Sequence, residues 1–337
     1  VQSVCPDAEV VQVPVSDGGE GFLEAFHVAI GGDIVDVSVR APLMRQITAK
    51  YLLKGDTAVI EIAQASGLTL LTPEERNPMV ATSYGTGQLV ADAVRRGAKH
   101  IIVGLGGSAT SDAGMGMLQA LIDAFTDHGN WNDIQELRDV RFTIASDVTN
   151  PLCGENGAAY VFAPQKGATP DMVLRLDERA RKFAEVSALH FGYDRSTEPG
   201  AGAAGGLGYA FLQYLNAEYK PGIQLLLDTI NFSSIIKDAD LVITGEGAAD
   251  SQTLMGKLPM GILRKTSKIP VFLIAGRISD RDELLKAGFA GGECINPAGF
   301  SLEEAMRPDV ARKNIADTVR RVLSDIVANN NQPITKQ

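Results

Sequence analysis

Short apolar runs that end in glycine-rich polar turns constrain the fold of this chain more than any other feature. The run Leu241–Thr244 is followed by Gly245-Glu246-Gly247 and then by Asp250 and Lys257. At least three other runs end in the same way. Buried strands that stop at glycines and polar groups form ligand crevices at the carboxyl ends of open α/β sheets. The pattern therefore predicts an α/β protein with a ligand site at its strand ends.

Length and charge narrow the class of protein. A chain of 337 residues favours two domains, and 45% hydrophobic with 21% charged residues is typical of a soluble protein with a large core. The net charge of −10 argues against nucleic acid or an anionic membrane as the main partner. Cys5, Cys153 and Cys294 lie too far apart for a metal motif or a disulfide framework, so we expect a cytoplasmic protein.

The first third of the chain predicts a mixed, partly antiparallel region. Residues 34–39 alternate as in a half-buried strand, and residues 10–15 are also strand-like. The runs 47–54 and 57–63 flank Gly55-Asp56, which is a two-residue hairpin signal.

From residue 86 onward the pattern is that of a parallel α/β sheet. An amphipathic helix, a buried strand, a glycine loop and a second helix follow one another, which is a βα unit. The expected helices are 86–96, 113–124, 172–189, 207–215, 302–306 and 310–328. The expected strands are 100–105, 141–145, 241–244 and 270–275.

Gly106-Gly107-Ser108 is the first candidate site. It lies between a buried strand and a helix, where backbone N–H groups can hold an anion. It is neither a Walker A loop nor a dinucleotide fingerprint, because the required lysine and glycine spacings are missing. A tight βα turn that needs small residues is an equally good explanation of the loop by itself.

Four other candidates also have structural explanations of their own, and the glycine-rich segment 199–208 is the most specific of them. Asp17-Gly18-Gly19-Glu20 is also typical of an exposed turn, and Asp147 of a turn cap. Lys166 by itself resembles an ordinary surface lysine. The glycine-rich segment 199–208, which contains Gly202, indicates close approach to a ligand, a hinge or tight helix packing.

Together these candidates supply glycine, carboxylate, hydroxyl and lysine groups without a histidine base. The four histidines do not cluster, and no Gly-x-Ser-x-Gly elbow follows a strand, which disfavours a serine hydrolase. Missing fingerprint glycines count against a nicotinamide-dependent dehydrogenase. Phosphoryl transfer needs positioning, carboxylates for magnesium, and cationic or N–H groups for the phosphate charge, so it suits this inventory best.

At this point the chain resembles the bacterial glycerate kinase family, the single-chain type of glycerate and glucarate degradation. The matching segments follow the family order over almost the whole chain. They are residues 13–21, 60–68, 82–87, 104–112, 146–152, 164–168, 199–208, 243–247 and 250–257.

The resemblance implies ATP-dependent phosphorylation of D-glycerate with Mg²⁺. The expected product is 2-phosphoglycerate, and 3-phosphoglycerate is the alternative product. A kinase of another small hydroxy acid and a catalytically silent sugar-acid-binding protein are the alternatives. The implied fold is α/β, with a Rossmann-like parallel α/β/α domain and a second, inserted mixed α/β domain. We expect the first domain at 1–12, 79–160 and 236–337, with its first strand missing, and the second at 13–78 and 161–235.

The expected site residues follow from the matching motifs. We hypothesise catalytic roles for Asp147, a candidate general base, and for Glu246, Asp250 and Lys257; Glu246 and Asp250 would also hold the metal, and Lys257 would neutralise phosphate. The nucleotide would lie on Gly106, Gly107, Ser108, Gly245 and Gly247. The substrate would contact Asp17, Gly18, Gly19, Asn150, Lys166 and Gly202. Ala248-Ala249 departs from relatives that carry a basic residue there.

Overall fold

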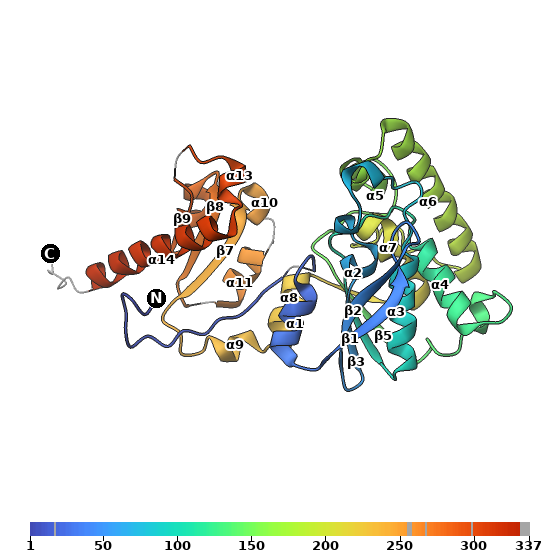
Figure 1. The fold of residues 1–337 in the computed structure, drawn as a ribbon, viewed down its shortest axis with the longest axis horizontal. Coiled ribbons are helices and arrows are strands. Elements are labelled where there is room, and N and C mark those ends of the chain that lie inside the picture. Colours follow the sequence, from blue (N-terminus) through green and yellow to red (C-terminus); the bar gives the residue numbers. More distant parts are fainter. Residues whose placement is uncertain (17, 255–257, 267, 298, 331–337) are drawn as a thin grey trace. The chain divides into compact units, whose positions relative to one another are not determined.

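The computed structural model describes residues 1–337 except 17, 255–257, 267, 298 and 331–337. The chain divides into two compact units (Figure 1). One consists of Val1–Val13 with Asn231–Gln337, and the other of Pro14–Ile230. We describe each unit by itself.

The unit Pro14–Ile230 is built on one mixed six-stranded sheet. Its strands lie in sequence order, and the first three are antiparallel while the third to sixth are parallel. The predicted hairpin is confirmed, because Lys54 pairs with Thr57 around Gly55-Asp56. The strands are β1 (Asp33–Arg40), β2 (Gln46–Lys54), β3 (Thr57–Glu61), β4 (His100–Gly104), β5 (Arg141–Ala145) and β6 (Glu218–Lys220).

Helices cover both faces of this sheet, as the side chains of β4 illustrate. Ile101 and Val103 belong to a buried cluster with residues of α3 (Tyr84–Arg95), α4 (Met115–Phe125) and α7 (Ala203–Leu215). Ile102 belongs to a second cluster with residues of α1 (Phe22–Ile30) and α8 (Gly222–Thr229). Alternate residues of a strand point to opposite faces, so β4 is buried on both sides. The predicted α/β class with a parallel, helix-covered sheet is therefore confirmed.

Shorter elements and one long helix complete this unit. They are α2 (Ala63–Ser66), α5 (Ala158–Phe162), α6 (Pro170–Phe191) and the 3-10 helices η1 (Leu68–Leu70), η2 (Pro73–Glu75), η3 (Trp131–Asp133) and η4 (Pro164–Lys166). The N-cap of α6 is Thr169, whose hydroxyl accepts the amide of Met172, and Pro170 follows it at the first helical position. Both are helix-start signals, and they explain why α6 begins before the predicted residue 172.

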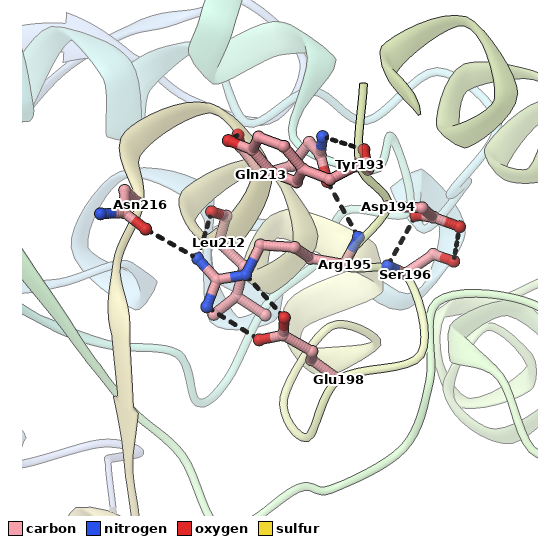
Figure 2. A network of polar contacts seen from close by, with 8 residues as sticks. All are labelled: Tyr193, Asp194, Arg195, Ser196, Glu198, Leu212, Gln213 and Asn216. Atoms are coloured by element: carbon pink, nitrogen blue, oxygen red, sulfur yellow. Dashed lines mark hydrogen bonds and ion pairs between the residues drawn. The ribbon is translucent and has the colours of Figure 1, made fainter. Parts of the chain in front are cut away.

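A polar network fixes the connection between α6 and α7 (Figure 2). The guanidinium of Arg195 donates two hydrogen bonds of 2.8 Å to the carboxylate of Glu198. It also donates to the carbonyl of Leu212 at 2.8 Å and to the side chain of Asn216 at 3.2 Å. The amide of Arg195 donates to the Gln213 side chain at 2.9 Å. The segment that leads into the glycine-rich residues 199–208 is thus held against α7.

The unit Val1–Val13 with Asn231–Gln337 contains a parallel three-stranded sheet. Its strands are β7 (Val242–Ala249), β8 (Val271–Ile278) and β9 (Gly291–Cys294), in that order. Its helices are α9 (Phe232–Ile235), α10 (Ser251–Leu254), α11 (Leu258–Thr266), α12 (Arg281–Ala287), α13 (Leu302–Ala305) and α14 (Pro308–Asn330).

Three sequence expectations differ from the structure. β7 does not end in a turn at Gly245-Glu246-Gly247 but continues to Ala249, because Glu246 and Ala248 keep their register with Ala275 and Arg277 of β8. Residues 10–15 form no strand. The predicted domain boundaries assigned β3 and β4 to different domains, whereas these strands are parallel neighbours in one sheet.

None of the helices in the described part of the chain combines the length and apolar character that crossing a membrane requires.

Candidate active site

Three segments far apart in sequence meet where β4 and β5 end. The amide of Gly106 donates to the carbonyl of Gly18 at 2.7 Å, and the amide of Leu105 donates to that of Ala145 at 3.1 Å. A Cβ atom at Gly106 would lie 2.2 Å from Cα of Gly19. Glycine is therefore required at 106, and the predicted residues Gly18, Gly19 and Gly106 lie together at the carboxyl edge of the sheet.

The rest of the Gly106–Ser108 loop is held by the segment that follows β3. The carbonyl of Gly107 accepts the amide of Leu68, and the amide of Ala109 donates to the carbonyl of Ser66, both at 2.8 Å. Gly107 is exposed and has φ +71°, a left-handed conformation that favours glycine. The loop thus presents an exposed backbone on a fixed support.

Asp112 occupies the N-terminus of α4. One carboxylate oxygen accepts the amide of Gly114 at 3.1 Å, and the other accepts those of Ser83 at 2.8 Å and Gly116 at 3.1 Å. The hydroxyl of Ser83 adds a bond of 2.9 Å. Helix-start amides that are bonded to a carboxylate cannot also bind a ligand. An anion at this loop would therefore use the Gly106–Ser108 segment and not the start of α4.

Lys166 lies at the end of η4, with its ammonium beneath the same loop. Nζ donates to Oγ of Ser108 at 2.8 Å and to the carbonyl of Thr110 at 2.7 Å. The side chain is only 3% exposed. Burial lowers the pKa of Lys166 to about 7, against the opposing charge of Asp112. The predicted substrate residue Lys166 and the predicted phosphate loop are thus in direct contact.

Asp147 is the second residue after β5 and is half-buried. One of its carboxylate oxygens accepts the amide of Gly222, the first residue of α8, at 3.1 Å. Burial, together with the charge of Asp147, raises the pKa of Tyr219 to about 12. The candidate general base is therefore held at the carboxyl edge of the sheet by the first amide of α8.

Asn150 and Gly202 pack against each other's segments. The amide of Gly202 donates to the carbonyl of Asn150 at 2.8 Å, and a Cβ atom at Gly202 would lie 2.3 Å from the carbonyl oxygen of Pro151. The Asn150 side chain donates to the carbonyl of Asn156 at 2.8 Å. Close packing is therefore enough to explain the glycine at 202.

Glu246 and Asp250 belong to the other unit, Glu246 within β7 and Asp250 directly after it. Oε1 of Glu246 accepts the hydroxyl of Thr253 at 2.5 Å. The same hydroxyl oxygen accepts the amide of Asp250 at 3.0 Å. Gly245 and Gly247 flank Glu246 within the strand. Thr253 thus links the carboxylate of Glu246 to the backbone amide of Asp250.

The magnesium site stays a prediction, and the chemistry of the carboxylates allows it. Among the described residues, no group of three or more His, Cys, Asp or Glu side chains could hold a metal ion. Magnesium in kinases is commonly bound by only one or two carboxylates, with substrate phosphates and water as the other ligands. Glu246 and Asp250 fit that donor set. Asp17 and Lys257 lie outside the described residues.

Two buried acidic residues of the site region were not named as candidates from the sequence, although both lie within the matching segments. Asp112 caps α4, and Glu61, at the end of β3, accepts the amide of Leu23 in the first turn of α1 at 3.0 Å. Burial raises the pKa of Glu61. Each stands at the junction of a strand or loop with a helix start, and that position was the signal available in the sequence.

Comparisons with known proteins identify the family of the chain. A model of the glycerate kinase family matches residues 1–327. A glycerate kinase of Bacillus subtilis (strain 168) is 41% identical over 350 residues, which cover 97% of this chain and 90% of that protein. A glycerate 2-kinase of Escherichia coli (strain K12) is 45% identical over 303 residues, which cover 83% and 79%.

Structural similarity extends over the same length. A crystal structure assigned as a glycerate kinase 2 from Salmonella typhimurium LT2 has a TM-score of 0.80 and 37% sequence identity, and the match covers 98% of this chain and 92% of that one. The family model and the identities together decide the classification. The chain belongs to the glycerate kinase family, and it is therefore a phosphotransferase.

Proposed function

We propose that the protein transfers the γ-phosphoryl group of ATP to D-glycerate, with Mg²⁺, and releases ADP and 2-phosphoglycerate. The alternative product, 3-phosphoglycerate, differs only in which hydroxyl attacks. The name of the Escherichia coli relative, glycerate 2-kinase, supports the first product. We also propose that the protein acts in the cytoplasm on small molecules, without nucleic acid or membrane partners.

The observation that carries the proposal is the buried Lys166 ammonium beneath the Gly106–Ser108 loop. Among the described residues Lys166 has no ion-pair partner, and its two acceptors are a neutral hydroxyl and a carbonyl. A buried cation without a counter-ion is costly unless a ligand supplies the negative charge. A carboxylate or a phosphoryl group at the loop would do so, and glycerate and ATP each carry such a group.

The other residues have roles that the chemistry of the transfer requires. Asp147 would accept the proton of the attacking hydroxyl, which would make that oxygen a better nucleophile. Glu246 and Asp250 would hold Mg²⁺, which when bound neutralises charge on the phosphates. Gly245 and Gly247 would let the nucleotide approach β7 closely, and Lys257 would neutralise developing phosphate charge.

A coupled assay of ADP release tests the proposal. We expect ADP release with D-glycerate and little with glycerol, which has the same carbon skeleton without the carboxylate. Coupling the product directly to enolase reports 2-phosphoglycerate, whereas 3-phosphoglycerate requires added phosphoglycerate mutase. ADP release that does not depend on D-glycerate would overturn the proposal. A signal that requires the mutase would change only the product.

A further inference from the structure

The direction of the hydrogen bond between Lys166 and Ser108 has a consequence for ligand binding. An ammonium group can donate hydrogen bonds but cannot accept one. The Ser108 oxygen, 2.8 Å from Nζ, is therefore the acceptor when Lys166 is charged. The hydroxyl proton of Ser108 must then point elsewhere. Among the described residues no acceptor is recorded for it.

The surroundings of Ser108 leave a ligand as the natural acceptor. Ser108 is 8% exposed, and it follows the exposed Gly107 at the carboxyl edge of the sheet. The buried hydroxyls of Thr110 and Ser111, on the same loop, also lack partners among the described residues. Buried hydroxyl groups without partners are rare in folded proteins, and they are commonly explained by a ligand or water.

The charges around the loop favour a negative ligand. The guanidinium of Arg179 donates to the carbonyl of Ser111 at 2.9 Å, so a second cation reaches the loop through a neutral acceptor. Arg76 packs beside Gly167, and its buried Nε lacks a partner within the described part of the chain. Among the described residues, the acidic group that acts on the charge of Lys166 is Asp112, whose carboxylate oxygens already accept hydrogen bonds from α4 and Ser83.

We propose that Ser108, oriented and polarised by Lys166, donates its hydroxyl proton to an oxyanion bound on the Gly106–Ser108 loop. The oxyanion is either the carboxylate of the hydroxy acid or a phosphoryl group of the nucleotide. Ser108 contacts the ligand, and Lys166 is a positioning residue that acts through it. The inference depends on the proposed function only for the identity of these two ligands.

A protonation switch follows from the same geometry. A neutral Lys166 amine can accept a hydrogen bond, so the Ser108 hydroxyl would donate to Nζ of Lys166 and not to the ligand. The ligand would then lose the hydroxyl donor that the Lys166 ammonium orients and polarises. Burial lowers the pKa of Lys166 to about 7, so the change falls near neutral pH. Affinity for the oxyanion is therefore highest below pH 7 and declines above it.

Titration calorimetry of the full chain tests the inference, with D-glycerate alone in one arm and ADP with Mg²⁺ in the other. We expect the affinity of one ligand to fall by up to tenfold per pH unit above about pH 7. Ser108→Ala and Lys166→Met should each lower the affinity for that ligand at pH 6 by roughly 10- to 100-fold, because each removes a charge-assisted hydrogen bond. Both variants should show a flatter pH profile, and Lys182→Met, on the exposed face of α6, should not.

The double variant distinguishes a shared role from two separate ones. Because Lys166 acts through Ser108, Ser108→Ala/Lys166→Met should bind no more weakly than either single variant. Multiplied losses, or a pH profile of Lys166→Met or Ser108→Ala that matches the wild type, would overturn the inference. If Lys166→Met does not fold, the profile of Ser108→Ala decides. The ligand whose affinity changes identifies the source of the oxyanion.

Failure of this inference and failure of the proposed function have different signatures. Binding with the expected pH profile but no phosphorylation of D-glycerate would leave the inference standing and remove the function. Normal phosphorylation with unchanged binding in Ser108→Ala and Lys166→Met would remove the inference and leave the function standing.

Discussion

The ends of β4 and β7 carry the same sequence pattern but form different structures. After β4 the chain enters a loop at Gly106. The backbone there lies so close to Gly19 that no side chain fits at position 106. In β7, Gly245 and Gly247 continue the strand, and a Cβ atom at Gly247 would meet nothing within 4 Å. Glycine is thus a steric necessity at 106 but not at 247, whereas a Cβ atom at Gly245 would lie 2.9 Å from the carbonyl oxygen of Ile274. An apolar run that reaches glycine therefore need not end its strand, because β7 keeps its pairing with β8 on both sides of its glycines.

The largest expected effect concerns the carboxylates at the end of β7. Glu246→Gln and Asp250→Asn should each lower kcat by about 1,000-fold, or about 4 kcal/mol in activation free energy, because each removes a charge that holds the metal and phosphates. Steady-state kinetics and thermal unfolding measure the two consequences, and folding should hardly change. Asp309→Asn, at a surface ion pair in the same unit, is the control. A kcat within a few-fold of the wild type would contradict these metal and catalytic roles.

The two glycines test the comparison itself. Gly106→Ala should lower the free energy of unfolding by about 3 kcal/mol, the upper end of overpacking costs, because its Cβ meets backbone atoms. Gly247→Ala should change it by less than about 0.5 kcal/mol. Urea denaturation of both variants gives the values. Equal losses would show that the steric difference between the two strand ends does not determine stability.

The cap of α4 should have the next largest effect. Asp112→Asn replaces one carboxylate oxygen by an amide that cannot accept the amides of Ser83 and Gly116 or of Gly114. We expect a loss of about 2 kcal/mol in the free energy of unfolding, as for a broken buried hydrogen-bond network. Asp133→Asn, at an exposed position, is the matched control and should be neutral within about 0.5 kcal/mol. If Asp112→Asn left the free energy of unfolding unchanged, the hydrogen-bond network of Asp112 would add no stability.

The smallest expected effect is the pH dependence of stability due to Lys166. Its pKa is lowered in the folded protein, so between about pH 7 and pH 10 the unfolded chain holds a proton that the folded chain does not. Stability of the wild type should therefore rise with pH relative to Lys166→Met, by at most about 1.4 kcal/mol per unit. Denaturation midpoints of both proteins across this range check the sign. Parallel pH profiles would contradict the lowered pKa.

Local signals explain how much of the fold the sequence could predict. Gly55-Asp56 fixed the β2–β3 hairpin, and the apolar runs located β4 and β5, because turn chemistry and burial act within a few residues. The run Val10–Val15 failed as a strand, since strand-like composition needs a partner strand to form a ladder. β7 does not end at Gly245 as predicted, because its pairing with β8 continues to Ala249.

The candidate site was predictable as a set of motifs but not as contacts. The hydrogen bond from Lys166 to Ser108 joins residues 58 positions apart, and no local pattern distinguishes this lysine from a surface one. Asp112 caps α4 and also bonds Ser83, the residue before α3, so its role depends on the close approach of the two helix starts. Long-range packing decides such contacts, so the structure was needed to connect the phosphate loop with its buried cation.

The most direct test of the account is ³¹P NMR of the full chain incubated with ATP, Mg²⁺ and D-glycerate. We predict that the signals of ATP are replaced by those of ADP and, in equal amount, by the phosphate ester resonance of 2-phosphoglycerate. The same incubation with glycerol should leave ATP essentially unchanged. Inorganic phosphate in place of an ester, or no consumption of ATP that depends on D-glycerate, would contradict the account.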